Sequence, residues 1–128
     1  MKEDGMNYRV TMYPDYEDGL FWDEIGARCG TSKYVFVYDE DNSVEVDLSS
    51  IVGLTDWVAE WEHYEAINRG YVKKVPKIRP EQQKSMDKRG LDFAKAIKRL
   101  LPDDVDILYR CSYSDEKFLL TRNIRGEN

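Results

Sequence analysis

The spacing of apolar side chains divides the chain into stretches with two kinds of periodicity. A period of two, which is typical of strands, recurs in residues 8–13, 33–38, 44–48, 105–113 and 118–122. Pro14 ends the first of these stretches. Short polar runs separate the second from the third and the fourth from the fifth, so the pattern predicts two hairpins.

Two further stretches repeat their apolar residues every three to four positions, as the buried face of a helix does. The first has Thr55 or Ser50 near its start and carries Leu54, Trp57, Val58, Trp61 and Tyr64. The second begins at Pro80, ends before Pro102 and carries Met86, Gly90, Phe93, Ala94, Ile97, Leu100 and Leu101. Residues 71–79 between them are predicted to be a linker.

Two connections complete the pattern near the N-terminal end. Residues 14–19 contain proline, aspartate and glycine and predict a loop. Leu20, Phe21 and Trp22 return the chain to the core, in a conformation compatible with a short helix. Residues 26–32 are interpreted as a second loop.

The order of strand, hairpin, two helices and hairpin favours an α+β fold. A mainly antiparallel sheet of about five strands, with two long helices packed on one face, would bury every apolar face. A chain of 128 residues is of single-domain size and buries roughly two thirds of its unfolded surface. We therefore expect one domain over residues 1–128, with residues 1–6 and 123–128 frayed.

Composition favours a folded protein, because hydrophobic residues make up 41% of the chain. No apolar stretch approaches the roughly 20 residues of a membrane span, so we expect a cytoplasmic protein. Cys29 and Cys111 are the only cysteines and lack the spacing of a metal site or a disulfide scaffold. Free, buried thiols are expected.

The net charge of −6 hides a division along the chain. Residues 1–68 hold 16 acidic and 4 basic side chains, whereas residues 69–99 hold 3 acidic and 11 basic ones. Such segregation influences partners and association rates more than it influences fold.

The stretch TDWVAEWEHYE, residues 55–65, contains two tryptophans, four acids and the only histidine. At about 100° per residue, the tryptophans fall on the apolar face of a helix and His63 points nearly opposite, beside Asp56 and Glu60. We interpret His63 as a solvated surface histidine. Glu65 lies at the edge of the apolar face, where a hydrogen-bond donor or a rim position would explain it.

No motif in the sequence identifies a reaction. Residues 26–33 contain two glycines and a lysine, but their spacing differs from that of a phosphate-binding loop. A single histidine and no paired ligand spacing argue against a metal site, and we expect no cofactor. We predict no catalytic residue. A small enzyme that uses His63 and scattered carboxylates remains the third alternative.

The strongest functional signal is a surface on which acids and aromatic residues are interleaved. Such a surface suits a basic protein partner, since acids speed the encounter and buried rings hold the complex. In the alternative interpretation, the rings belong to the core and the acids only keep the protein soluble. The predicted partner-binding residues are Asp15, Tyr16, Glu17, Asp18, Trp22, Asp23, Glu24, Asp39, Glu40 and Asp41.

The second predicted helix also carries a basic stripe opposite its apolar face. Its members are Lys84, Lys88, Lys95, Lys98 and Arg99. A stripe of this kind could contact phosphates, so a nucleic-acid-associated protein is the first alternative function. A solvated helix face is the simpler interpretation.

Several segments carry a resemblance that extends over most of the chain. They are residues 18–24 (DGLFWDE), the frame of Leu54, Trp57 and Trp61 with Tyr64 and Glu65, and residues 89–91, 100–102 and 105–109. Together they resemble small acidic bacterial proteins, some of which are immunity proteins of polymorphic or contact-dependent toxin systems. The resemblance implies a cytosolic inhibitor that binds one cognate toxin, often a basic nuclease, and blocks its active site or substrate surface.

Overall fold

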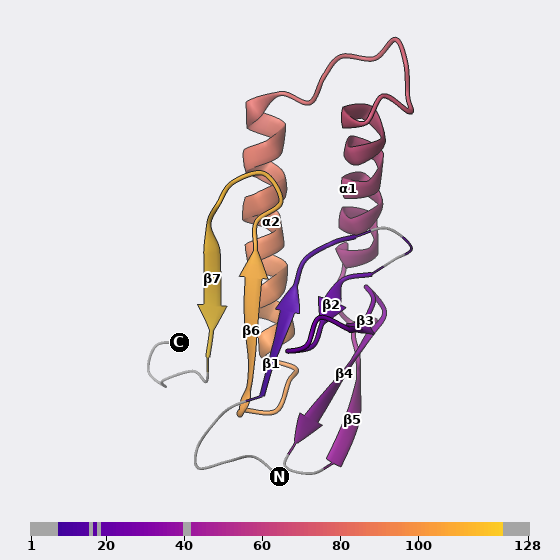
Figure 1. Cartoon of the computed structure of the whole chain (residues 1–128). Helices are drawn as coiled ribbons and strands as arrows, with labels where there is room; N and C mark the ends of the chain where they lie inside the picture. Colours follow the sequence, from indigo (N-terminus) through magenta and orange to yellow (C-terminus); the bar gives the residue numbers. More distant parts are fainter. Residues whose placement is uncertain (1–7, 16, 18, 40–41, 122–128) are drawn as a thin grey trace.

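The computed structural model describes residues 8–15, 17, 19–39 and 42–121, so the predicted frayed ends lie outside the described residues. Figure 1 shows strands at the front and two helices behind them. The elements are β1 (Tyr8–Met12), β2 (Phe21–Trp22), β3 (Arg28–Gly30), β4 (Tyr34–Asp39), β5 (Asn42–Asp47), α1 (Leu54–Asn68), α2 (Pro80–Lys98), β6 (Val105–Arg110) and β7 (Lys117–Leu120). The chain is therefore α+β.

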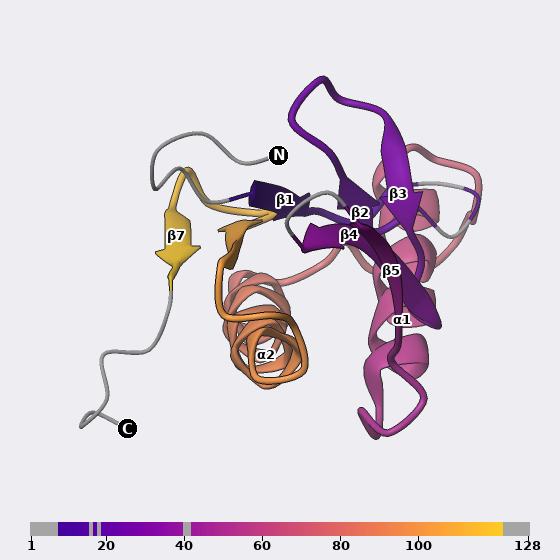
Figure 2. The same cartoon turned by 90° about the horizontal axis from the view of Figure 1, so that it is seen from below.

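The sheet differs from the predicted five-stranded antiparallel one, and that prediction was wrong. It has seven strands in the order β5-β4-β3-β2-β1-β6-β7, and β1 and β6 run parallel. The other neighbours are antiparallel, so the sheet is mixed. Figure 2 shows that the sheet is strongly curled. We call the side that bears the helices the inner face and the opposite side the outer face.

The two additional strands lie where the sequence suggested other structure. Residues 21–22, predicted as a short helix, form β2, and the predicted loop 26–32 contains β3. Both strands are too short to show a period of two. Gly30 allows β3 to approach β4 closely, because a Cβ there would lie 2.6 Å from the carbonyl oxygen of Tyr34.

The remaining strand predictions are confirmed. β1 ends before Pro14, and β4 and β5 form a regular hairpin in which Tyr34 is opposite Asp47 and Val37 is opposite Val44. β6 and β7 form the second hairpin. β6 ends at Arg110, three residues earlier than the alternation to Tyr113 suggested.

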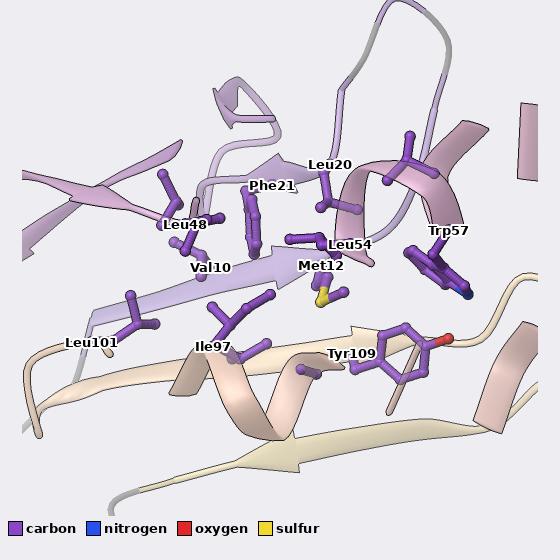
Figure 3. Close-up of a cluster of buried hydrophobic side chains, with 14 of the residues drawn as sticks. Val10, Met12, Leu20, Phe21, Leu48, Leu54, Trp57, Ile97, Leu101 and Tyr109 are labelled. Atoms are coloured by element: carbon purple, nitrogen blue, oxygen red, sulfur yellow. The ribbon is translucent and has the colours of Figure 1, made fainter. Parts of the chain in front are cut away.

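The core lies between the inner face of the sheet and the two helices (Figure 3). Both predicted helices are present and contribute their apolar faces, and the tryptophans at positions 57 and 61 are buried. His63 is exposed, as predicted. Among the described residues, neither helix has the length and apolar content of a membrane span.

Two aromatic hydrogen bonds hold α2 in place. The indole nitrogen of Trp57 donates to the carbonyl oxygen of Met86 at 3.0 Å, and the Tyr109 hydroxyl donates to the carbonyl oxygen of Asp87 at 3.0 Å. Gly90 lies between the two rings. A Cβ at Gly90 would overlap the Tyr109 hydroxyl oxygen and lie 2.6 Å from the Trp57 ring, so this close contact requires glycine.

Polar contacts at the rim of the core join α1 to α2 and to the segment after β6. The Arg89 guanidinium donates to both carboxylate oxygens of Glu60, at 2.8 and 2.9 Å, and the Tyr64 hydroxyl donates to the same carboxylate at 2.7 Å. The Tyr113 hydroxyl donates to Glu65 at 3.1 Å. This contact supplies the donor that the rim position of Glu65 predicted.

Candidate partner-binding site

A shallow hollow of about 380 Å³ opens on the outer face where β1, β2 and β6 end. Four of the predicted partner-binding residues line it: Asp15, Trp22, Asp23 and Glu24. The other lining residues are Thr11, Tyr13, Gly26 and Arg110. The structure therefore gathers part of the predicted acidic and aromatic surface around one depression.

Trp22 is directed to the outer face because its strand neighbour Phe21 is fully buried on the inner face. Its indole nitrogen donates to the carbonyl oxygen of Tyr13 at 2.8 Å. This bond fixes a half-buried indole as one wall of the hollow. A held aromatic wall of this kind loses little conformational entropy when a partner covers it.

The turn between β2 and β3 projects from the outer face, away from the helices (Figure 2). One carboxylate oxygen of Asp23 accepts the backbone N–H groups of Ile25 and Ala27 at 3.0 and 2.9 Å. Gly26 has a φ of 87°, which closes the turn in a conformation that glycine adopts without strain. Asp23 therefore shapes the turn as well as contributing charge.

Ile25 lies in this braced turn and is 90% exposed. The turn also carries Glu24, an exposed residue that lines the hollow. This large apolar side chain thus stands in solvent between two residues that line the hollow, Glu24 and Gly26, where it is a candidate anchor for a partner.

Arg110 brings a positive charge to the acidic hollow. Its guanidinium lies over the Tyr13 ring, 4.7 Å from the centroid, which is a cation–π distance. The charge of the hollow is thus divided between the acids of the β1 and β2 ends and one arginine from β6. A basic ligand would be attracted to the acidic side and repelled by Arg110.

The other predicted partner-binding residues do not line this hollow. Glu17 is exposed and lies 3.8 Å from the guanidinium of Arg28. Asp39 ends β4 at the opposite end of the sheet, beside the β4–β5 turn (Figure 1), and nothing is described of its side chain. Tyr16, Asp18, Glu40 and Asp41 lie outside the described residues.

Sequence reasoning missed Arg110 and Ile25. Arg110 follows the alternation of Val105, Ile107 and Tyr109, which indicated that it points away from the core, but only the pairing of β6 with β1 brings it to Tyr13. Ile25 is an isolated apolar residue beside Gly26, and the loop assigned from that glycine could have identified it as exposed.

The basic stripe is displayed on α2. Lys84, Lys88, Lys95 and Arg99 are exposed, whereas Lys98 is half-buried and donates to the carbonyl oxygen of Asp103 at 3.4 Å. Asp87 lies between Lys84 and Lys88 in the sequence, but its carboxylate accepts the backbone N–H groups of Ser112 and Tyr113 at 2.9 and 3.2 Å. Its hydrogen bonds are thus to the segment after β6.

The surroundings of the two cysteines do not activate their thiols. Burial, together with the charge of Asp23, raises the pKa of the Cys29 thiol to about 12, and burial also raises the pKa of Cys111. Neither thiol is therefore a ready thiolate at neutral pH. Within the described ranges, no group of three or more His, Cys, Asp or Glu residues is placed to hold a metal ion.

Comparison with protein-family models, with curated proteins and with solved structures finds no match to this chain.

Proposed function

We propose that the protein is a binding module that captures a basic protein at the hollow of the outer face, and that it acts as an immunity-type inhibitor of that partner. The observation that carries the proposal is Ile25, a 90% exposed apolar side chain in the turn that Asp23 braces, between Glu24 and Gly26, which both line the hollow. Its exposure, the braced backbone of its turn and its acidic neighbours suit an anchor that enters a pocket of a positively charged partner.

The division of charge within the hollow supports a specific orientation. Asp15, Asp23 and Glu24 lie on the β1 and β2 side, and Arg110 lies on the β6 side. We propose that a lysine or arginine of the partner docks beside Asp15 and Glu24, with Ile25 covered by an apolar part of the partner. An inhibitor that binds in this way would meet its target in the cytoplasm.

The first experiment identifies the partner by comparison of three immobilised proteins. They are the wild type, the variant Ile25→Ser in the turn beside the hollow, and the control His63→Ala on the exposed side of α1. A protein retained by the wild type and by the control, but not by Ile25→Ser, is a partner of this site. The product of a neighbouring gene is the first candidate, and its activity should be inhibited by the wild type but not by Ile25→Ser. Equal retention by all three proteins contradicts the proposal.

Kinetics then separate charge from anchoring. Glu24→Gln should slow association, most at low salt, whereas Arg110→Gln should speed it, because the two changes alter the field of the hollow in opposite directions. Ile25→Ser should instead raise the dissociation rate at every salt concentration, roughly thirtyfold for a loss of about 2 kcal/mol at an anchor residue. Stopped-flow measurements give both rates. If neither substitution changes the association rate, the docking surface must lie elsewhere.

A second candidate function rests on the exposed basic stripe of α2. If Lys84, Lys88 and Lys95 bind phosphates, their replacement by glutamine should abolish nucleic-acid binding. Each lysine replaced should also reduce the slope of log affinity against log salt concentration by about one unit. Replacement of Arg9 and Lys33, which are exposed on β1 and just before β4, is the control. Gel-shift titrations over a salt series decide between the candidates, and no binding by the wild type at physiological salt removes this one.

A further inference from the structure

The two edges of the sheet are built differently. β7 has only four residues and begins with Lys117. A short strand and a lysine at the edge both discourage pairing with another strand. β5 has six residues in unbroken register with β4 and contains neither proline nor lysine. Among the described residues, no strand pairs with its far side. The carboxylates of Glu45 and Asp47 protect this edge against like-charged strands but leave it open to a strand of opposite charge.

The register shows which peptide groups of β5 are free to bond. The N–H of Leu48 donates to the carbonyl oxygen of Lys33 at 2.9 Å, which makes these two residues a hydrogen-bonded pair. Hydrogen-bonded and non-bonded pairs alternate along an antiparallel ladder, so Val46 and Val44 also bond to β4. The backbone groups of Ser43, Glu45 and Asp47 therefore point away from β4 and towards the open edge.

The side chains of β5 define what a neighbouring strand should look like. Val44 and Val46 lie on the inner face opposite the fully buried Val37 and Val35, yet they are only half-buried, because the core is open beside them. The exposed residues Ser43, Glu45 and Asp47 lie on the outer face. A hydrogen bond from the backbone N–H of Ser49 at 2.9 Å lowers the pKa of Asp47, so this carboxylate remains charged at neutral pH.

We propose that β5 accepts an extended segment of a partner protein as an eighth strand of the sheet. The segment alternates apolar residues, which cover Val44 and Val46, with lysine or arginine residues, which lie beside Glu45 and Asp47. Strand addition of this kind obtains affinity from main-chain hydrogen bonds and specificity from alternate side chains. It requires neither the hollow nor an inhibitory function, since β4 and β3 lie between β5 and the strands that form the hollow.

A second copy of this chain is a poorer occupant of the edge. Pairing of two β5 strands would bring Glu45 and Asp47 of one copy beside the same carboxylates of the other. Like charges on neighbouring strands are destabilising. Charge complementarity therefore favours a basic segment of another protein.

The test uses the full-length protein and a seven-residue peptide of alternating lysine and valine with blocked ends. A peptide of the same composition, with four lysines followed by three valines, is the control for general charge attraction. Amide hydrogen exchange, followed by NMR, should be fast at Ser43, Glu45 and Asp47 in the free protein and slowed at least about tenfold when the alternating peptide is bound. Val44 and Val46 should be protected in both states.

Two variants make the test specific. Glu45→Pro removes one outward N–H group without touching the bonds to β4, and it should weaken binding of the alternating peptide at least about tenfold. Glu45→Lys keeps the N–H group and should shift the preference towards a peptide of alternating glutamate and valine. This second variant decides the question if the proline variant does not fold.

Four results would overturn the proposal. The first is slow exchange of the three outward amides in the free protein at any concentration, because the edge would then already be covered. The second is protection that depends on protein concentration in the absence of peptide, which would identify a second copy as the occupant. The third is equal binding of the alternating and block peptides, and the fourth is binding that is unaffected by both substitutions at Glu45.

Discussion

Tyr109 and Arg110 are neighbours on β6, but they belong to two very different surfaces. Tyr109 is completely buried on the inner face, where its hydroxyl reaches the backbone of α2 and Gly90 leaves no room for a methyl group. Arg110 is exposed on the outer face and rests on Tyr13 beside an open hollow.

Under the proposed function, one strand would contribute one residue to folding stability and the next residue to partner binding. On the inner face, helix and sheet are in tight contact, and the Trp57 and Tyr109 donors both have backbone acceptors, so substitutions there should act on folding. On the outer face, Glu24, Ile25 and Arg110 are exposed to solvent. Substitutions there should leave folding nearly unchanged and act on binding.

The largest effect is expected on the inner face at Trp57. Trp57→Ala should lower the free energy of unfolding by about 3 to 5 kcal/mol, because it removes a buried ring and the hydrogen bond to Met86. His63→Ala, on the exposed side of the same helix, should change it by no more than a few tenths of a kcal/mol. Chemical denaturation measures both. A loss at His63 as large as that at Trp57 would show that the outer side of α1 also carries stability.

The next effect concerns the tight contact at Gly90. Gly90→Ala should destabilise by about 2 to 3 kcal/mol, since overpacking exceeds the gain of about 1 kcal/mol in helix propensity. The second substitution Tyr109→Phe removes the hydroxyl that the new Cβ would meet and should restore part of the stability in the double variant. Asp92→Ala, at an exposed position of α2, is the control. Stabilisation by Gly90→Ala would mean that the helix can move away from the sheet.

A smaller effect is expected at the rim, in the ion pair between Arg89 and Glu60. Glu60→Gln should lower the free energy of unfolding by about 1 kcal/mol at neutral pH, because the ion pair is bidentate but partly solvated. The hydrogen bonds from Arg89 hold the pKa of Glu60 below its usual value of 4.5, so the stabilisation is present above that value and is lost as pH falls through the lower folded-state pKa.

The difference between the wild type and Glu60→Gln should therefore shrink in acid, below about pH 4.5. Burial raises the pKa of Asp87, so the contribution of Asp87 to stability changes with pH in the opposite direction. This contribution is common to both proteins and cancels in the comparison. Denaturant unfolding from pH 2 to pH 7 measures the difference. A difference that stays constant with pH would show that the glutamine side chain replaces the carboxylate as the partner of Arg89.

The smallest effect on folding is expected at the outer face. Ile25→Ser should change the free energy of unfolding by less than about 0.5 kcal/mol, because the side chain is 90% exposed. Thermal or chemical denaturation of this variant sharpens the comparison of the two faces, since the same substitution should speed dissociation of the partner. A large loss of stability would mean that Ile25 has a structural role in its turn.

The sequence predicted the elements that have a long and regular pattern. Both helices and both hairpins were found, because a buried face imposes its period on ten or more residues. β2 and β3 were not predicted, because two or three residues cannot show a period. Their pairing depends on Gly30 and on the neighbouring strands. The parallel contact between β1 and β6 has no local signal at all, since it joins residues almost a hundred positions apart.

The candidate site was predicted in part for the same reason. Asp15, Trp22, Asp23 and Glu24 are close in sequence and were proposed together, and the ends of two adjacent strands keep them together in space. Arg110 could not be assigned to the site from its own neighbourhood. Its place depends on the long-range pairing of β6, which also turns a uniformly acidic surface into one with a positive side.

The parallel pair of β1 and β6 also has a consequence for how the protein is made. Tyr8 is opposite Val105, so the centre of the sheet cannot close until the chain has been made as far as β6 and this segment has left the ribosome. Pairing across such a separation must overcome a large loop-closure entropy, and folds rich in distant contacts fold slowly. During synthesis the β4–β5 hairpin can form before β6 is made, while the side of β1 that pairs with β6 remains unpaired. The nascent chain is then exposed to wrong pairing for longer than a chain with only local hairpins would be.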